Sequence, residues 1–288
     1  MRKIYNIADK KIKITSPFES YDEDNIKMFL SNNSDEEADI CYDIVKGNDL
    51  KVNEENLIYE EYKIKVYKNE DEIVWKFGDC KSKIGYSSLV ENKDKVRKLY
   101  VYGDIEKLFP HTSAIFTKLN IQGSLLRNDV LILHSSFIIH NNKSILFTAP
   151  SGTGKSTQAG LWEKYKDAEI INGDRSAIGV RNNEYFAYGI PFSGSSKICK
   201  NKEAKINVIV ALEQSKENSV RKLSKIEAVK ILLSQVAINR WNKEEMKIVM
   251  SLIEQLIEKV PVLLLSCRPD KAATDVLSEY LNNELELK

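Results

Sequence analysis

The chain has 288 residues, enough for one large domain or two modest ones. Its 43 Lys and Arg residues nearly balance its 42 Asp and Glu residues, so the composition favours neither a nucleic-acid partner nor an anionic membrane. Four cysteines without C-x-x-C spacing argue against a zinc cage and fit a reducing cytosol. Because no signal-peptide core and no apolar run of membrane-spanning length occurs, we expect a cytoplasmic protein that spans no membrane.

Residues 1–105 contain short runs in which apolar and charged residues alternate. Such alternation is typical of half-buried strands. The pattern predicts strands at 11–14, 62–67 and 73–77. The segment 68–72 is a plausible turn, and the acidic, Asn- and Ser-rich stretch 22–40 predicts a loop or a short helix.

The rest of the chain alternates longer helices and strands. The pattern predicts a helix over 112–127, then an apolar run at 130–139 that turns at Asn141-Asn142 into a strand at 144–148. Further along it predicts strands at 168–172, 206–212 and 261–266, helices at 224–238, 243–259 and 270–282, and a turn at Asn182-Asn183. Ser224 and Asp270 are the expected N-caps of the first and last of these helices.

Residues 149–157, directly after an apolar strand, read Ala-Pro-Ser-Gly-Thr-Gly-Lys-Ser-Thr. They match the Walker A phosphate loop G-x-x-x-x-G-K-[ST] except that Ala149 replaces the first glycine. The two glycines let the backbone approach a phosphate, the lysine can reach the β- and γ-phosphates, and the serine hydroxyl can ligate Mg²⁺. A chance Gly-rich turn is the alternative, and the strand–loop–helix context argues against it. The expected phosphate-binding residues are Pro150, Ser151, Gly152, Thr153, Gly154, Lys155, Ser156 and Thr157.

Asp174 follows an apolar strand, one helix and one strand after the phosphate loop. A carboxylate at such a position can hold Mg²⁺, directly or through water, or accept the proton of an attacking hydroxyl. The sequence Asn172-Gly173-Asp174-Arg175 is also a good turn, because Gly173 is free to take a positive φ. The nearby phosphate loop favours the functional interpretation over the turn alone.

Over residues 130–280 the chain resembles the HPr kinase/phosphorylase family, which shares its nucleotide-binding core with phosphoenolpyruvate carboxykinases. The resemblance is carried by His134 before the hairpin, the loop at 151–156, and Gly173-Asp174. A Tyr-Gly-x-Pro-Phe-x-Gly stretch at 188–194 and Leu-Glu-Gln at 212–214 resemble more specifically the HPr-kinase-like peptide serine kinases of bacterial peptide-modification clusters. The chain departs from HPr kinase in one respect, since the first Asp of the family's Asp-Asp pair is Gly173 here.

The resemblance implies an α/β (α+β) fold with a mixed-sheet P-loop core. It implies a kinase domain at 106–288 and a β-rich N-terminal region at 1–105 that selects a substrate or partner. HPr kinases form hexamers, so a homo-oligomer is compatible with it, although nothing in the sequence demands one. It places His134 near the γ-phosphate; the alternative is a half-buried histidine making one hydrogen bond.

Motifs and resemblance together predict a kinase that uses ATP and Mg²⁺. The γ-phosphoryl group would pass in line to a hydroxyl, most simply a Ser or Thr of a peptide or protein, with Asp174, Lys155 and His134 as catalytic residues and Ser156 and Asp174 holding Mg²⁺. A nucleotide-binding ATPase or switch without an acceptor and a small-molecule alcohol kinase stay open as alternatives. The sequence leaves the acceptor, the base preference and reversibility undetermined.

One further loop and two further residues each allow two interpretations. The loop at 194–197 could bind an anion through Lys197 or be merely flexible, and Arg268 could face the phosphates or lie on the surface. Cys199 could lie near the site, but a small buried apolar residue is the simpler interpretation.

Overall fold

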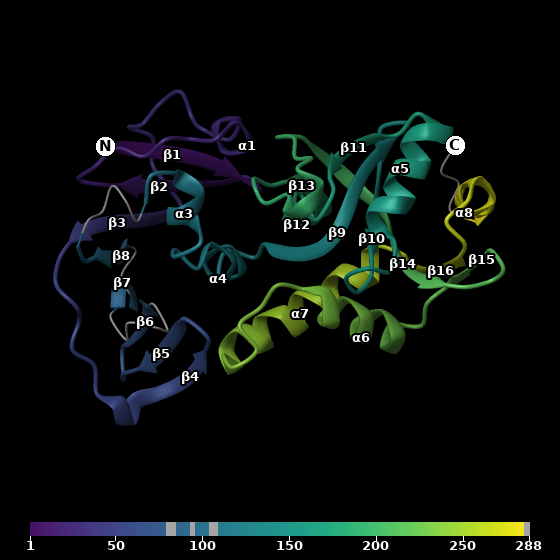
Figure 1. The fold of residues 1–288 in the computed structure, drawn as a ribbon. Helices are drawn as coiled ribbons and strands as arrows, with labels where there is room; N and C mark the ends of the chain where they lie inside the picture. The colour runs from purple at the N-terminus through teal and green to yellow at the C-terminus, as the bar shows by residue number, and fades with distance from the viewer. Residues whose placement is uncertain (79–84, 93–95, 104–108, 285–288) are drawn as a thin grey trace. The chain divides into compact units, whose positions relative to one another are not determined.

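The computed structural model describes residues 1–78, 85–92, 96–103 and 109–284. In these residues the chain is a mixed α/β protein with two eight-stranded mixed sheets (Figure 1). The chain divides into two compact units, Met1–Ser124 and Leu125–Lys288, and the division falls within α4 (Ile121–Leu126). The domain boundary expected after residue 105 lies outside the described residues, as does Cys80.

The first unit is built on one sheet with the strand order β1-β2-β3-β8-β7-β6-β5-β4. Its elements are β1 (Arg2–Ile7), β2 (Lys10–Thr15), α1 (Asp24–Lys27), β3 (Ile40–Lys46), η1 (Glu54–Asn56), β4 (Leu57–Glu61), β5 (Ile64–Lys68), β6 (Glu72–Gly78), β7 (Gly85–Asn92), β8 (Val96–Val101) and α3 (Thr112–Phe116). The predicted strands at 11–14, 62–67 and 73–77 correspond to β2, β5 and β6. The middle one begins two residues late because Tyr62 has a φ of 45° and belongs to the preceding turn.

The helix predicted over 112–127 is wrong as a single element, because the chain forms α3 and α4 with a break between them. Asn120 has a φ of 44°, outside the range of a right-handed helix, and its Oδ1 accepts a hydrogen bond from Gly123 N at 3.3 Å. Asn120 therefore interrupts one helix and caps the next. Phe116 packs edge-on against Tyr5, with ring centroids 5.1 Å apart, which ties α3 to the first sheet.

The second unit follows the predicted order closely. Its elements are β9 (Leu131–His140), β10 (Lys143–Thr148), α5 (Lys155–Lys166), β11 (Glu169–Asn172), β12 (Arg175–Arg181), β13 (Glu184–Gly189), η2 (Gly194–Ser196), β14 (Glu203–Gln214), β15 (Ser219–Lys222), α6 (Lys225–Gln235), α7 (Lys243–Lys259), β16 (Val262–Cys267) and α8 (Lys271–Glu284). The β9–β10 and β12–β13 hairpins turn at Asn141-Asn142 and Asn182-Asn183, all four with positive φ. Paired positive φ angles match the right-handed twist of a hairpin, and Asn tolerates them.

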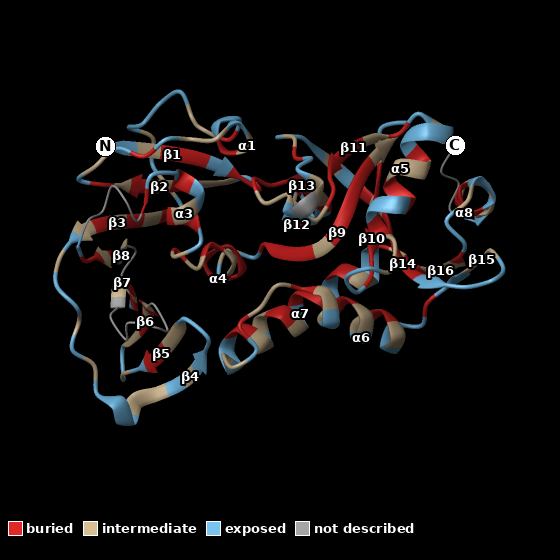
Figure 2. Ribbon diagram, in the orientation of Figure 1, coloured by how far each residue is buried: buried red, intermediate tan, exposed pale blue. Residues whose placement is uncertain are grey.

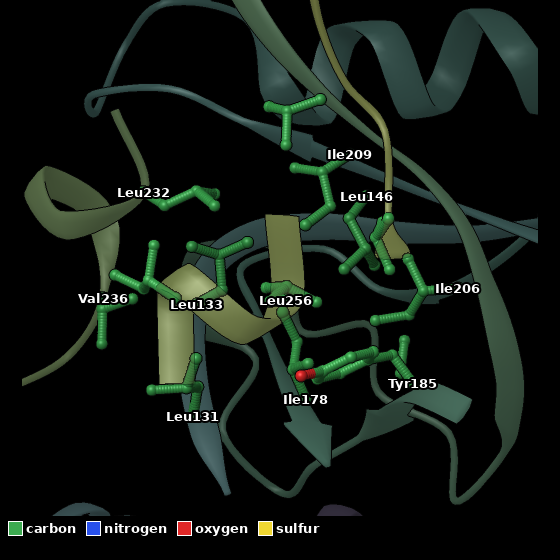
Figure 3. Packing of buried hydrophobic residues seen from close by; sticks show 14 of the residues in the cluster. Leu131, Leu133, Leu146, Ile178, Tyr185, Ile206, Ile209, Leu232, Val236 and Leu256 are labelled. Atoms are coloured by element: carbon green, nitrogen blue, oxygen red, sulfur yellow. The ribbon is translucent and has the colours of Figure 1, made fainter. Parts of the chain in front are cut away.

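Helices cover both faces of the second sheet. Successive residues of β10 alternate between the faces, so Ile145 and Phe147 pack in a cluster with α5 and α8, whereas Leu146 packs in a cluster with α6 and α7. Figure 2 shows the buried residues concentrated along the central strands, and Figure 3 shows the cluster around Leu146. No helix among the described residues has the length and apolar character that crossing a lipid bilayer requires.

The predicted helix starts are confirmed. Ser224 forms a capping box with Glu227 at the start of α6, and Asp270 Oδ1 accepts from Ala273 N at 3.0 Å at the start of α8. The predicted end of α6 at residue 238 is wrong by three residues, since Val236 leaves the helix with a ψ of 134° and pairs with Leu133 of β9.

The strands β10, β14 and β16 are parallel neighbours. Their carboxyl ends therefore lie along one edge of the second sheet, and the loop that follows β10 emerges there. In open α/β sheets this edge is where ligands bind.

Candidate functional site

The phosphate-loop sequence lies between β10 and α5, as predicted. Gly152 has a φ of 80° and Gly154 a φ of 120°, angles that side-chain-bearing residues rarely adopt. A Cβ atom at either position would meet nothing within 4 Å, so backbone conformation, rather than crowding, requires glycine. No side chain caps α5 at Gly154, and the N-terminal N–H groups of this twelve-residue helix are available to an anion.

Lys155 is 6% exposed, and its Nζ donates to the carbonyl oxygens of Ala149 at 2.9 Å and Pro150 at 3.3 Å. Burial lowers the pKa of this ammonium group, and the negative charge of Asp174 acts in the opposite direction. Among the described residues no carboxylate lies within 4.0 Å of Nζ. The loop carbonyl groups thus hold a partly desolvated cation. A bound anion would compensate its positive charge.

The pairing of β9 explains how Asp174 comes close to the phosphate loop. The first part of β9 pairs with β12, where His134 is opposite Arg175, and its second part pairs with β10, where Ser135 is opposite Thr148. The edge of β9 that pairs with β12 continues with β11, and β10 occupies the opposite edge. Because the phosphate loop follows Thr148 and Asp174 precedes β12, β9 brings the two segments to neighbouring positions, one on each side of the strand.

Direct hydrogen bonds join the same segments. Ser156 Oγ, at the start of α5, donates to Gly173 O at 3.2 Å, and Ser136 Oγ of β9 donates to the same oxygen at 2.9 Å. Ser135 N donates to Asp174 O at 3.0 Å. The turn that carries Asp174 is therefore fixed to both β9 and the phosphate-loop helix.

The two carboxylate oxygens of Asp174 have different surroundings. Oδ1 lies 3.6 Å from His134 Nε2, and Oδ2 lies 3.4 Å from Arg175 Nε. Gly194 lies against the carboxyl group, since a Cβ atom there would be 2.5 Å from Asp174 Cγ. Gly194 thus permits an approach that any side chain would prevent.

His134 lies between Asp174 and Gln235. Its Nδ1 is 3.3 Å from Gln235 Oε1, while Gln235 Nε2 donates to Ser234 Oγ at 2.9 Å. With the Gln235 amide in this orientation the proton lies on Nδ1, so in the neutral ring the Nε2 lone pair faces Asp174 and makes no hydrogen bond with the ionised carboxylate. Burial, and secondly the charge of Lys155, lowers the pKa of His134, which favours the neutral ring.

Gly173 stands where the resembling family has its first Asp, and the structure gives a steric reason for the smaller residue. A Cβ atom at Gly173 would lie 2.5 Å from Ser196 Cβ, because η2 packs over the turn. Gly173 N also donates to Ile198 O at 3.2 Å. A second carboxylate cannot be placed here without moving η2, so Asp174 has no acidic neighbour at position 173.

The remaining residues that the sequence singled out differ in their burial and in their contacts. Thr153 O accepts from Gln214 Nε2 at 3.4 Å, which links the loop to the end of β14. Pro150, Ser151, Ser156 and Thr157 are exposed along the loop and the first turn of α5. Arg268 donates from Nε to Asp270 Oδ2 at 2.8 Å, and Lys197 is exposed with a φ of 56°. Cys199 is buried, as the simpler interpretation predicts, and it also lies near the site, because its backbone pairs with that of Asn172.

Sequence reasoning gave Gln235 no role, and it named Asn172 only as part of a turn and Ser196 only as part of the loop at 194–197. These three residues contact residues from another part of the chain or across a turn. A local sequence pattern does not predict such contacts. The Asn-Gly-Asp spacing was the one available signal for Asn172, since Asn often accepts hydrogen bonds from the backbone two residues on.

The donor set suits a magnesium–nucleotide complex better than a metal held by protein alone. Among the described residues no group of three or more His, Cys, Asp or Glu side chains could hold a metal ion. Mg²⁺ in nucleotide sites usually binds one or two protein oxygens, phosphate oxygens and water. Ser156 and Asp174 could supply the protein oxygens, and Lys155 with the α5 N-terminus could compensate the phosphates.

Comparison with known proteins adds little to this geometry. No family model matches the chain, and no curated protein matches it. Among solved structures, the Hpr(Ser) kinase/phosphatase from Coxiella burnetii is 13% identical, covering 54% of this chain and 98% of that one, with a TM-score of 0.33. A likeness of this size is below what establishes a shared fold.

Proposed function

We propose that this chain is an ATP- and Mg²⁺-dependent phosphotransferase that moves a phosphoryl group to a hydroxyl acceptor. One observation carries the proposal. The turn bearing Asp174 is bonded through Gly173 O to Ser156, the residue directly after the phosphate-loop lysine. A phosphate-binding loop next to a carboxylate is the minimum constellation for phosphoryl transfer assisted by Mg²⁺.

Each residue has a distinct role in this proposal. The backbone N–H groups at 152–156 bind phosphate oxygens, and Lys155 places a positive charge beside them. Mg²⁺, when bound, neutralises phosphate charge, and Ser156 and Asp174 are the side chains able to hold it. Asp174 also orients the acceptor hydroxyl and accepts its proton, while neutral His134 presents Nε2 to the Asp174 carboxyl group.

The expected acceptor is a Ser or Thr hydroxyl of a peptide or protein, selected by the N-terminal β-rich unit. This part of the proposal is supported by the sequence resemblance to peptide serine kinases, which rests on the motifs from His134 to Gln214. A small alcohol is the variant of the same chemistry that needs no peptide-binding surface.

A nucleotide-dependent switch that hydrolyses ATP without an acceptor is the second candidate. Ser196 fills the space beside Gly173, so the site has no acidic residue at 173 to share proton transfer with Asp174. Water could then take the place of the hydroxyl acceptor. The two candidates share the nucleotide site and differ in the product formed.

The test is to incubate the full chain with Mg²⁺, γ-labelled ATP and an array of Ser- and Thr-containing peptides. The proposal predicts label on a hydroxyl side chain, lost in Lys155→Met and retained in Lys164→Met, a matched change at an exposed lysine of the same helix. Release of inorganic phosphate without label on any peptide or small alcohol would instead support the switch. Failure to bind MgATP would refute both.

A further inference from the structure

Asn172 uses its whole side-chain amide to connect two segments of the site. Its Oδ1 accepts hydrogen bonds from Asp174 N and Arg175 N, both at 3.0 Å. Its Nδ2 donates to Ile190 O at 2.9 Å and Phe192 O at 3.1 Å. An amide side chain offers two donor hydrogens and one acceptor oxygen with two lone pairs, so these four bonds use its full capacity.

Asn172 is also fully buried, at 0% exposure. Both the carbonyl oxygen and the amino group of this buried amide are needed. Removing either one would leave its hydrogen-bond partners unpaired inside the protein. No residue of similar size could replace both functions: a carboxylate lacks the donors, and Leu lacks the donors and the acceptor.

The two segments joined by Asn172 are the turn that presents Asp174 and the loop that contacts its carboxyl group. The segment 190–192 leads into Gly194, which lies against Asp174 Cγ. The direction of the carboxyl group, with Oδ1 toward His134 and Oδ2 toward Arg175, therefore depends on the spacing between turn and loop.

We propose that Asn172 is the positioning residue for Asp174, holding the turn and the 190–194 loop in the register that turns Oδ1 toward His134. This inference rests on the proposed phosphotransferase function. Asn172 touches neither nucleotide nor acceptor and acts only through Asp174. A displacement of about 1 Å at a reacting group can cost about a hundredfold in rate.

The test compares Asn172→Ala with Asn239→Ala. Asn239 is a second buried amide of the same unit, whose Nδ2 donates to Glu245 Oε2 at 2.9 Å, so its replacement matches the loss of a buried polar contact away from Asp174. For folded protein, the account predicts that Asn172→Ala lowers kcat about a hundredfold and changes KM for ATP by less than about threefold. Asn239→Ala should leave both constants unchanged.

A second readout does not depend on activity. Hydrogen exchange at the Asp174 and Arg175 amides, and across 190–196, should accelerate in Asn172→Ala and stay unchanged in Asn239→Ala. Wild-type kcat in folded Asn172→Ala, or equal kcat losses in the two variants, would overturn the positioning role. Absence of transfer by the wild-type chain would instead refute the proposed function, and unchanged exchange in Asn172→Ala would still overturn the connection that Asn172 is inferred to make.

Discussion

Ser196 occupies the space that any side chain at position 173 would need. A Cβ atom on Gly173 would lie 2.5 Å from the Cβ atom of Ser196, closer than such atoms approach in proteins. Gly173 is not among the glycines with positive φ, so crowding alone explains the absence of a side chain. The absence of a side chain at Gly173 therefore allows η2 to pack directly over the turn that carries Asp174.

Gly173→Ala should lower the free energy of unfolding by about 1–3 kcal/mol, the usual cost of overpacking. Combining it with Ser196→Gly should recover part of that loss, because the two side chains compete for one space. Urea unfolding of both single variants and the double variant measures the coupling, expected at about 0.5–3 kcal/mol. Strictly additive losses would show that the two residues do not crowd each other.

Gly154 and Gly160 provide a matched pair of glycines in and near the phosphate loop. Gly154→Ala forces a φ of 120° on an alanine and should lower the free energy of unfolding by about 1–2 kcal/mol while weakening MgATP binding. Gly160 lies in the middle of α5 with open space where a Cβ atom would be, so Gly160→Ala should raise the free energy of unfolding by about 0.5–1 kcal/mol. Calorimetry with and without MgATP checks both, and equal effects at the two positions would contradict the loop conformation.

His134 should make the folded chain less stable in acid. Its pKa in the folded state is lowered from 6.5, first by burial and then by Lys155, with Asp174 opposing and Arg175 adding to the lowering. Between the lowered pKa and 6.5 the unfolded chain binds more protons, so the free energy of unfolding falls as pH falls through this window.

The His134→Gln variant tests this sign. Removing the ring should flatten the fall in the free energy of unfolding as the pH drops below 6.5, measured by urea unfolding at several pH values. A steeper acid dependence in His134→Gln than in the wild-type chain would mean that folding raises the pKa of His134.

The sequence predicted what depends on neighbours in the chain. The strand before the phosphate loop, the loop glycines, α5 and the α6 cap at Ser224 all follow from local patterns, and the structure has them at the expected places. The same reasoning placed Asp174 at the end of a strand.

What the sequence could not predict depends on contacts between distant segments. The pairing of β9 with β12 and β11 along one edge and with β10 along the other involves strands from separate parts of the chain, and alternation within β9 does not reveal it. The contact of Ser196 with Gly173 likewise depends on tertiary packing, and Asn120 combines its local cap with a hydrogen bond from Nδ2 to Glu91 Oε2 of β7 at 2.9 Å, which overrides local helix propensity. The helix expected across 112–127 was wrong for this reason.

The central claim is that Asp174 acts on a nucleotide held by the phosphate loop, and Asp174→Asn tests it most directly. The variant keeps the shape of the side chain and removes its charge, so Mg²⁺-dependent ATP binding should stay within about tenfold while phosphoryl transfer falls by about 10²–10⁴-fold. Asp167→Asn is the matched control, because Asp167 ends α5 with a φ of 54° that Asn tolerates equally well. Transfer at the wild-type rate in Asp174→Asn would contradict the account.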